Sequence, residues 1–347
     1  MTMSSQSVPA VRFSDATRVE KLDSHIYRAN LEKAFCIVAV PNGGYVGSCM
    51  LAAAADHLAE RGQPDMITAH FEYPERTFPG PAIIKIEDIK LGSNISRLHL
   101  TLWQGKVLSE APWIDPASSS RKILAYSIHA DLNNFDGFSL PTGYEVTEGA
   151  ALPPQPDFNR LKTKGGDDVW EEQTLPKGSE EWHSLRNWQF FVPRQGPLTP
   201  GVMDVWIRLA SGERIVQGAL PYVFDSFPYN TYTFLVSPEF RKLVEPPKKK
   251  ADDNAESKET RAEAENTRAN LWMPTLVMNI EAKTRLPEEG VEWLAMRVSS
   301  KQIKDGKFDL EINLRDEDGE LISLGNQIAM IVSMEKNTKK RDTKAAL

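Results

Sequence analysis

The chain has 347 residues, which is enough for two domains of ordinary size. Hydrophobic residue types make up 41% of it and charged types 26%, a composition typical of globular proteins rather than of disordered or membrane-embedded ones. The net charge is −7, and the dense basic runs are confined to 248–250 and 339–341. Because binding to phosphate backbones needs a basic face, the sequence argues against nucleic acid as a partner.

No stretch approaches the roughly 20 consecutive apolar residues that a membrane-spanning helix needs. The first residues, MTMSSQSVPAVRF, also lack the apolar core of a signal peptide. The sequence therefore predicts a soluble, cytoplasmic protein with no membrane partner. Its two cysteines, Cys36 and Cys49, lie in apolar segments and are too few for a disulfide framework or a zinc cage, so we expect both to be buried.

The first predicted helix follows Pro41-Asn42-Gly43-Gly44-Tyr45. Apolar residues recur at helical spacing in the next segment, VGSCMLAAAADHLAERG. Asn42 can cap its start and Gly62 can end it.

Three strands are predicted after this helix, in the segments 82–91, 98–108 and 123–130, with a tight turn at Gln104-Gly105. A similar pattern occupies 291–303, 308–324 and 325–332, with a hairpin turn at Asp318-Gly319. The offset between the two patterns grows from 208 residues at the Pro79 and Pro287 positions to 214 at the two turns. This weak duplication predicts two copies of one β-rich domain, and the helix of the second copy is expected at Asp225 to Val236.

Two segments have the composition of connections. Residues 141–183 are rich in proline, glycine and acidic residues, which is typical of a linker. Residues 245–270 contain no large apolar side chain and are predicted to be a disordered, charged insertion. The predicted domains are therefore an N-terminal unit at 20–140 and a C-terminal unit at 184–335.

A helix wrapped by a curved antiparallel sheet, present twice, is the α+β architecture called a double hotdog. The chain also resembles the double-hotdog acyl-CoA thioesterases of the acyl-CoA thioesterase II type and their fungal thioesterase-like branch. The segments that carry this resemblance are the Asn-Gly-Gly-Tyr helix start, HFEYPERTFPG, YVFDSF, RLPEEGVEWL and DGELISLGNQ. The resemblance implies a lipid-metabolism hydrolase that acts on acyl-CoA or on an acyl-carrier thioester, with no redox or metal cofactor; it leaves the oligomeric state, including a homo-oligomer, open.

Asp225, in the matching segment YVFDSF, takes the role of the carboxylate that activates water. We expect it at the opening of the second helix, where the helix dipole would keep it ionised. The alternative is a plain helix cap, since aspartate is common there.

Gln327 matches the position of the family's water-orienting glutamine; the alternative is a solvated position on the last strand. The family's third water ligand, a hydroxyl, falls at Val277, which has none. Thr275 lies two residues away and so on the same strand face, and it could replace the missing hydroxyl if the register shifts. Without a hydroxyl, the alternative function is a catalytically idle acyl-binding or scaffold protein.

Three further residues are predicted to bind substrate. Gly43 and Gly44 let a ligand approach the amides at a helix start, although a turn or a packing role would explain them equally well. His70 lies on the predicted aromatic strand and is expected to line the site unless it has only a structural role.

Other chemistries find less support. The six histidines show no short metal-binding spacing, and no Gly-x-Ser-x-Gly nucleophile motif occurs. The hydratases of the same fold carry Asp-x-Asn-Pro-x-His, but here Phe227 and Asn230 stand where asparagine and histidine are needed.

Overall fold

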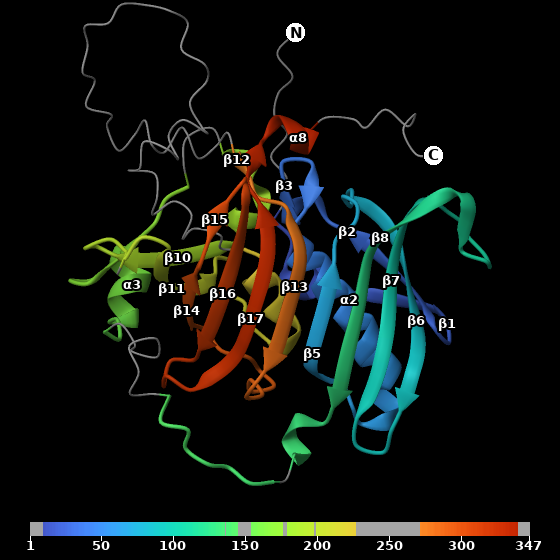
Figure 1. Cartoon of the computed structure of the whole chain (residues 1–347), viewed down its shortest axis with the longest axis horizontal. Coiled ribbons are helices and arrows are strands. Elements are labelled where there is room, and N and C mark those ends of the chain that lie inside the picture. Colours follow the sequence, from blue (N-terminus) through green and yellow to red (C-terminus); the bar gives the residue numbers. More distant parts are fainter. Residues whose placement is uncertain are drawn as a thin grey trace, which may run out of the picture.

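A computed structural model describes residues 10–135, 137–144, 154–175, 179–197, 199–226 and 271–338. Within these ranges, one antiparallel sheet of fourteen strands runs through the whole molecule, with strand order β1-β2-β6-β7-β8-β5-β13-β17-β16-β14-β11-β10-β9 and β15 paired to β16 (Figure 1). Two short pairs, β3-β4 and β12-β18, lie outside it.

The strands of the first half are β1 (Val19–Asp23), β2 (Ile26–Leu31), β3 (Cys36–Ile37), β4 (Val40–Pro41), β5 (Asp65–Glu72), β6 (Gly80–Leu91), β7 (Ser96–Val107) and β8 (Ile114–Ala130). Those of the second half are β9 (Trp170–Glu172), β10 (Trp188–Pro193), β11 (Val202–Leu209), β12 (Leu271–Trp272), β13 (Thr275–Ala282), β14 (Leu294–Ser299), β15 (Ile303–Lys304), β16 (Lys307–Arg315), β17 (Leu321–Met330) and β18 (Val332–Ser333). The helices are α1 (Phe13–Ala16), α2 (Gly43–Leu58), α3 (Phe158–Lys164), α4 (His183–Arg186), α5 (Leu220–Phe224) and α8 (Glu335–Thr338), with short 3-10 turns at 33–35, 59–61, 132–134 and 217–219. None of the helices in the described residues is long and apolar enough to cross a membrane.

The two halves meet where β5 pairs with β13, from Thr68 opposite Glu281 to Glu72 opposite Val277. The two curved sheets of the predicted double hotdog are therefore joined edge to edge into one sheet (Figure 1). Strand alternation places Phe71 and Met278 on the inner face of this seam, where both are fully buried.

Helix α2 lies against the inner face of the first half and packs against α5 of the second. The side chain of Asn42 caps it by accepting a hydrogen bond from the Tyr45 amide (2.8 Å), as predicted. A 3-10 turn continues the helix to Gly62, whose positive φ of 66° ends it. The helix is buried nearly all round, and Cys49 within it and Cys36 before it are both buried thiols, as expected.

The predicted turn at Gln104-Gly105 is wrong. Both residues lie inside β7, and the register shift beside Gly105, whose φ is 126°, marks a β-bulge. The chain turns instead at Glu110–Trp113, whose counterpart in the second half is the turn at Asp316–Gly319. The offset between these turns is 206 residues (319 minus 113), close to the 208 at the two prolines, so the structural repeat is more regular than the sequence indicated.

The described part of the predicted linker, residues 141–144, 154–175 and 179–183, contains more regular structure than a linker would. It contains α3 and β9, and β9 pairs with β10 at the edge of the sheet. Trp170 of β9 is fully buried in a small second core, so this part belongs to the C-terminal half. The predicted disordered insertion at 245–270 lies outside the described residues.

Candidate active site

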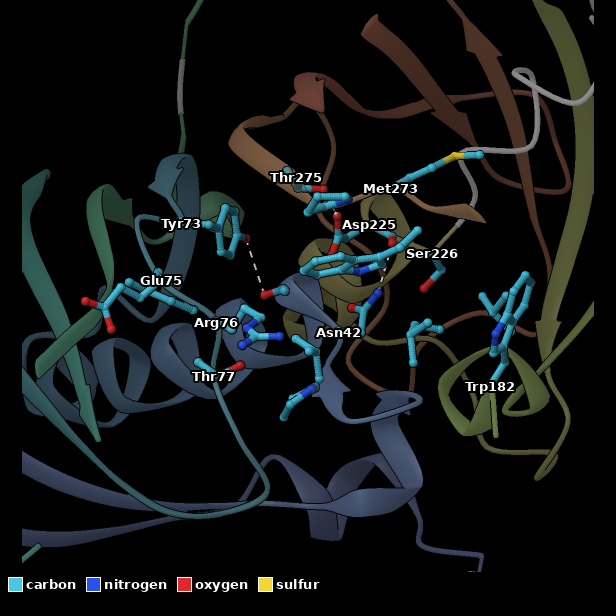
Figure 2. A pocket seen from close by; sticks show the side chains of 18 of the residues that line it. Asn42, Tyr73, Glu75, Arg76, Thr77, Trp182, Asp225, Ser226, Met273 and Thr275 are labelled. Atoms are coloured by element: carbon cyan, nitrogen blue, oxygen red, sulfur yellow. Dashed lines mark hydrogen bonds between the residues drawn. The ribbon is translucent and has the colours of Figure 1, made fainter. Parts of the chain in front are cut away.

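A pocket of about 150 Å³ lies where the start of α2, the end of α5 and the start of β13 meet. Figure 2 shows the labelled side chains Asn42, Asp225 and Thr275 gathered in its middle, with Tyr73 on one side and Trp182 on the other. Much of the rest of its lining is apolar: Ile37, Val40, Pro41, Ile123, Leu185, Leu271 and Met273. The pocket thus combines a carboxylate with walls that suit a hydrocarbon chain.

The sequence predicted Asp225 at the opening of a helix, but the structure places it directly after the end of α5. The helical turn forms earlier because Pro221, which suits the first turn of a helix, lies at its start. The predicted helix at 225–236 otherwise lies outside the described residues. The carboxylate instead faces the amino-terminal end of α2, since the Gly44 amide donates a hydrogen bond to its Oδ2 (2.9 Å). A helix dipole does act on Asp225, but it comes from the other half of the molecule.

The surroundings of Asp225 raise the pKa of its carboxyl toward neutral pH. Burial raises the pKa of its carboxyl from 3.8 to about 6, against the opposing effect of hydrogen bonds from the Thr275 hydroxyl and the amides of Gly44 and Gly43. A carboxylate with a pKa of about 6 is ionised at neutral pH and still basic enough to take a proton from water.

Two further residues hold this arrangement. The Asn42 side chain, which caps α2, also donates from Nδ2 to the backbone carbonyl of Asp225 (2.9 Å). The Tyr73 hydroxyl donates to the Gly43 carbonyl (3.3 Å), and burial together with the charge of Asp225 raises the pKa of that phenol. Asn42 thus ties the backbone of Asp225 to the start of α2, and Tyr73 holds Gly43 beside it; sequence reasoning identified Asn42 only as a helix cap and assigned Tyr73 no role in the site.

Thr275 reaches the site because β13 contains a bulge. Thr275 pairs with Ala329 but Val277 pairs with Ile328, so one extra residue, Leu276, is inserted between them. The expectation that Thr275 and Val277 share a strand face is therefore wrong: Val277 faces outward with the exposed Ile328, and Thr275 faces inward. The Thr275 hydroxyl donates to Oδ1 of Asp225 (2.6 Å), so the hydroxyl that the sequence seemed to lack is present.

Gln327 lies on the inner face of β17 and is only 2% exposed, which excludes a solvated strand position. Its Nε2 donates to the backbone carbonyl of Phe224 (2.9 Å), the residue before Asp225. The aromatic ring of Phe224 in turn packs over Gly325, where a Cβ would lie 2.2 Å from it. Gln327 therefore holds the turn that carries the carboxylate, and the hypothesis that the two side chains share one water stays a prediction.

His70 does not lie with these residues. It precedes Phe71 on β5, and strand alternation turns it to the outer face of the sheet. There its Nδ1 lies 2.7 Å from Oδ1 of Asn279 and its Nε2 lies 3.3 Å from Oε1 of Glu72. The structure thus contradicts the prediction that His70 lines the site with Asp225.

The two glycines are required by close packing. A Cβ on Gly44 would lie 2.0 Å from the Pro221 carbonyl oxygen and 2.6 Å from Cβ of Asp225. A Cβ on Gly43 would lie 2.9 Å from the Tyr73 ring and 3.0 Å from Oδ2 of Asp225. The glycines therefore allow α2 and α5 to approach closely enough for an amide of one half to reach the carboxylate of the other.

Replacing Gly44 with alanine should destabilise the protein by at least about 2 kcal/mol, because backbone atoms of α5 have to move to admit the methyl group. Gly218→Ala is the matched control, since a Cβ there meets nothing within 4 Å. Urea unfolding of both variants measures the difference. Equal midpoints for Gly44→Ala and the wild type would show that α2 and α5 do not pack this closely.

The curved antiparallel sheet, the central helix and the buried carboxylate at its start together define a double-hotdog protein. Two sequence-family models match the chain: the acyl-CoA thioesterase N-terminal domain at residues 31–114 and the acyl-CoA thioesterase C-terminal domain at residues 161–331. The thioesterase-like protein TwmA of Talaromyces wortmannii is 60% identical over 338 residues, which cover 96% of this chain and 97% of TwmA. The chain therefore belongs to the acyl-CoA thioesterase family.

Two solved structures show the same fold at low sequence identity. A hotdog-fold protein of unknown function from Alicyclobacillus acidocaldarius has a TM-score of 0.64 at 14% identity, covering 92% of this chain and 97% of that one. The acyl-CoA thioesterase II TesB2 from Mycobacterium marinum has a TM-score of 0.57 at 14% identity, again covering 92% and 97%. The predicted fold class and family are thus confirmed.

Proposed function

We propose that this protein hydrolyses an acyl-CoA in the pocket between α2, α5 and β13, using a water molecule activated by Asp225. The observation that carries this proposal is a carboxylate whose pKa is raised to about 6, held by Thr275 and Gly44 in the middle of a pocket with apolar walls. Family membership supports thioester hydrolysis as the reaction class.

In the proposed reaction, Asp225 accepts a proton as the oxygen of the bound water attacks the thioester carbonyl carbon. The carbonyl oxygen of the resulting tetrahedral intermediate becomes negative, and the positive end of the α2 dipole at Gly43 and Gly44 favours that charge. When the intermediate collapses, the carbon–sulfur bond breaks and Asp225 returns the proton to the leaving thiolate. The products are a carboxylic acid and free CoA.

The roles of the other site residues follow from their contacts. Thr275 orients the carboxylate through its hydroxyl, whose oxygen can also accept a hydrogen bond from the water. Gln327 fixes the turn before Asp225, and we assign its amide the further role of orienting the same water. The apolar lining from Ile37 to Met273 is assigned to the acyl chain.

The alternative of a catalytically idle acyl-binding or scaffold protein rested on the missing hydroxyl at Val277. Thr275 supplies that hydroxyl at 2.6 Å from Asp225, so the observation that favoured an idle protein no longer does so. An acyl-carrier thioester remains the alternative substrate, since the reacting group is the same.

A panel of acyl-CoA substrates, assayed by release of free thiol, tests the proposal. We expect turnover whose kcat/KM is level above pH 7 and falls about tenfold per pH unit well below the Asp225 pKa of about 6, because only the ionised carboxylate can take the proton. Subtracting spontaneous thioester hydrolysis at each pH is the control. Acyl-CoA binding without turnover on any substrate would support the idle protein, and a flat profile between pH 5 and 8 would exclude Asp225 as the base.

A further inference from the structure

Two of the six histidines converge with a carboxylate at the opposite end of α2 from the pocket. His57 lies in the last turn of α2, His25 in the turn between β1 and β2, and Asp88 on β6. Their ligand atoms, one from each side chain, all lie within 4.8 Å of one another. Since α2 rises about 1.5 Å per residue, the cluster is on the order of 20 Å from Gly43 and Gly44. It is therefore separate from the proposed active site.

We propose that His25, His57 and Asp88 bind a divalent zinc ion that fastens the β1–β2 turn and β6 to the end of α2. Two imidazoles and one carboxylate are ligands that zinc accepts, with a fourth position left for water.

The hydrogen bonds of His57 indicate which ring nitrogen is available for a metal. Its Nδ1 lies 3.1 Å from the backbone carbonyl oxygen of Ser24, which can only accept, so Nδ1 carries a proton. A neutral His57 then turns the lone pair of Nε2 toward Oδ1 of Asp88, which lies 2.8 Å away and is itself an acceptor. Either a proton on Nε2 or a metal ion between the two atoms removes this conflict, and the zinc titration below distinguishes them. A ring nitrogen anchored to a backbone carbonyl is also the usual outer contact of a metal-binding histidine.

His25 completes the set from the solvent side. Its Nε2 lies 3.0 Å from Oδ2 of Asp88 and its Nδ1 lies 2.9 Å from the Ser24 hydroxyl. The His25 side chain is 42% exposed, whereas that of His57 is 10% exposed, so an ion can enter from the His25 side. Ligand atoms around a tetrahedral zinc are about 3.3 Å apart, and small side-chain rotations from the present separations reach that geometry.

The local electrostatics also favour a cation. The end of α2 contributes partial negative charge from its carbonyl groups. This cluster left no signal in the sequence, because 32 residues separate the two histidines and only the packing of α2 against the sheet brings them together.

The test uses the full chain, stripped with EDTA and dialysed, then titrated with ZnCl₂ by calorimetry and in a thermal-unfolding assay, with MgCl₂ as the comparison ion. We expect one zinc bound per chain at micromolar or lower Kd, and a rise in Tm of several degrees in excess zinc but not in magnesium. His57→Gln and Asp88→Asn should each weaken zinc binding at least tenfold. His25→Gln changes the most exposed ligand and tests the same point if either of the other variants fails to fold.

His99→Gln is the matched control, because His99 lies 3.3 Å from Glu87 on the neighbouring strands β7 and β6, and this pair is not part of the three-ligand cluster. It should bind zinc like the wild type. The proposal is overturned if the wild type binds no zinc at 100 µM, or if the His57, Asp88 and His25 variants bind it as tightly as the wild type does.

Discussion

Replacing Asp225 with asparagine should lower the rate of acyl-CoA hydrolysis at pH 7.5 by at least about 100-fold. The amide is nearly the same shape as the carboxylate and can still accept a hydrogen bond from the Gly44 amide, but it cannot take a proton from water. Substrate binding should change little, because the proposed acyl chain would lie against the apolar walls of the pocket rather than on Asp225. Thiol release measures the rate, and a titration with a non-hydrolysable acyl-CoA analogue measures binding.

The stability of the same variant shows whether a lost rate comes from misfolding. The pKa of Asp225 lies above its ordinary value, so the folded protein takes up a proton more readily than the unfolded chain. Wild-type stability is therefore reduced as pH rises from about 4 through about 6, and Asp225→Asn escapes this loss. Relative to the wild type, the variant should gain on the order of 1 to 3 kcal/mol between pH 4 and pH 7.5. Undiminished hydrolysis by a folded Asp225→Asn protein would place the chemistry elsewhere.

Thr275→Val should reduce kcat/KM at least about tenfold at neutral pH. Valine matches threonine in shape but removes the hydroxyl that donates to Oδ1 of Asp225. That hydrogen bond lowers the pKa of the carboxyl, so its loss should also move the acid limb of the pH profile to higher pH. A merely structural role for Thr275 would not shift this limb, and the shift is read from kcat/KM between pH 4.5 and 8.

Two substitutions serve as controls for this prediction. Thr275→Ser keeps a hydroxyl in place and should retain most of the activity. Val277→Thr adds a hydroxyl on the outer face of the same strand, away from Asp225, so it should leave the rate unchanged. A gain in Val277→Thr, or full activity in Thr275→Val, would contradict the register that the bulge imposes.

The parts of the fold that were predictable have local signals. The start and end of α2 follow from Asn42 and Gly62, and the hairpin at Asp318-Gly319 follows from its turn residues. The family resemblance identified Asp225, the position of Thr275 two residues from Val277 made it a candidate, and the helix start identified the two glycines; the structure brings these residues together.

The features of the fold and site that could not be predicted depend on contacts between distant segments of the chain. The bulge at Leu276 leaves no mark in its own residue types, so simple alternation placed Val277 on the inner face with Thr275, whereas Val277 faces outward. Alternation also decides that His70 faces outward, but the sequence alone does not show which face of β5 is covered by α2. Asp225 was placed at the wrong end of a helix because its dipole partner, α2, lies 181 residues away along the chain.

The Asp225 carboxylate and the Gly44 amide that holds it come from different halves of the molecule, which meet along β5 and β13. The pocket therefore exists only while the halves are docked, because α2 contributes one wall and Asp225 and Thr275 another. Any ligand that fills it binds the docked form alone, and by mass action it must oppose separation of the halves. If the proposed substrate binds in this pocket, it should act as a reversible crosslink between the halves and raise the resistance of the protein to their separation.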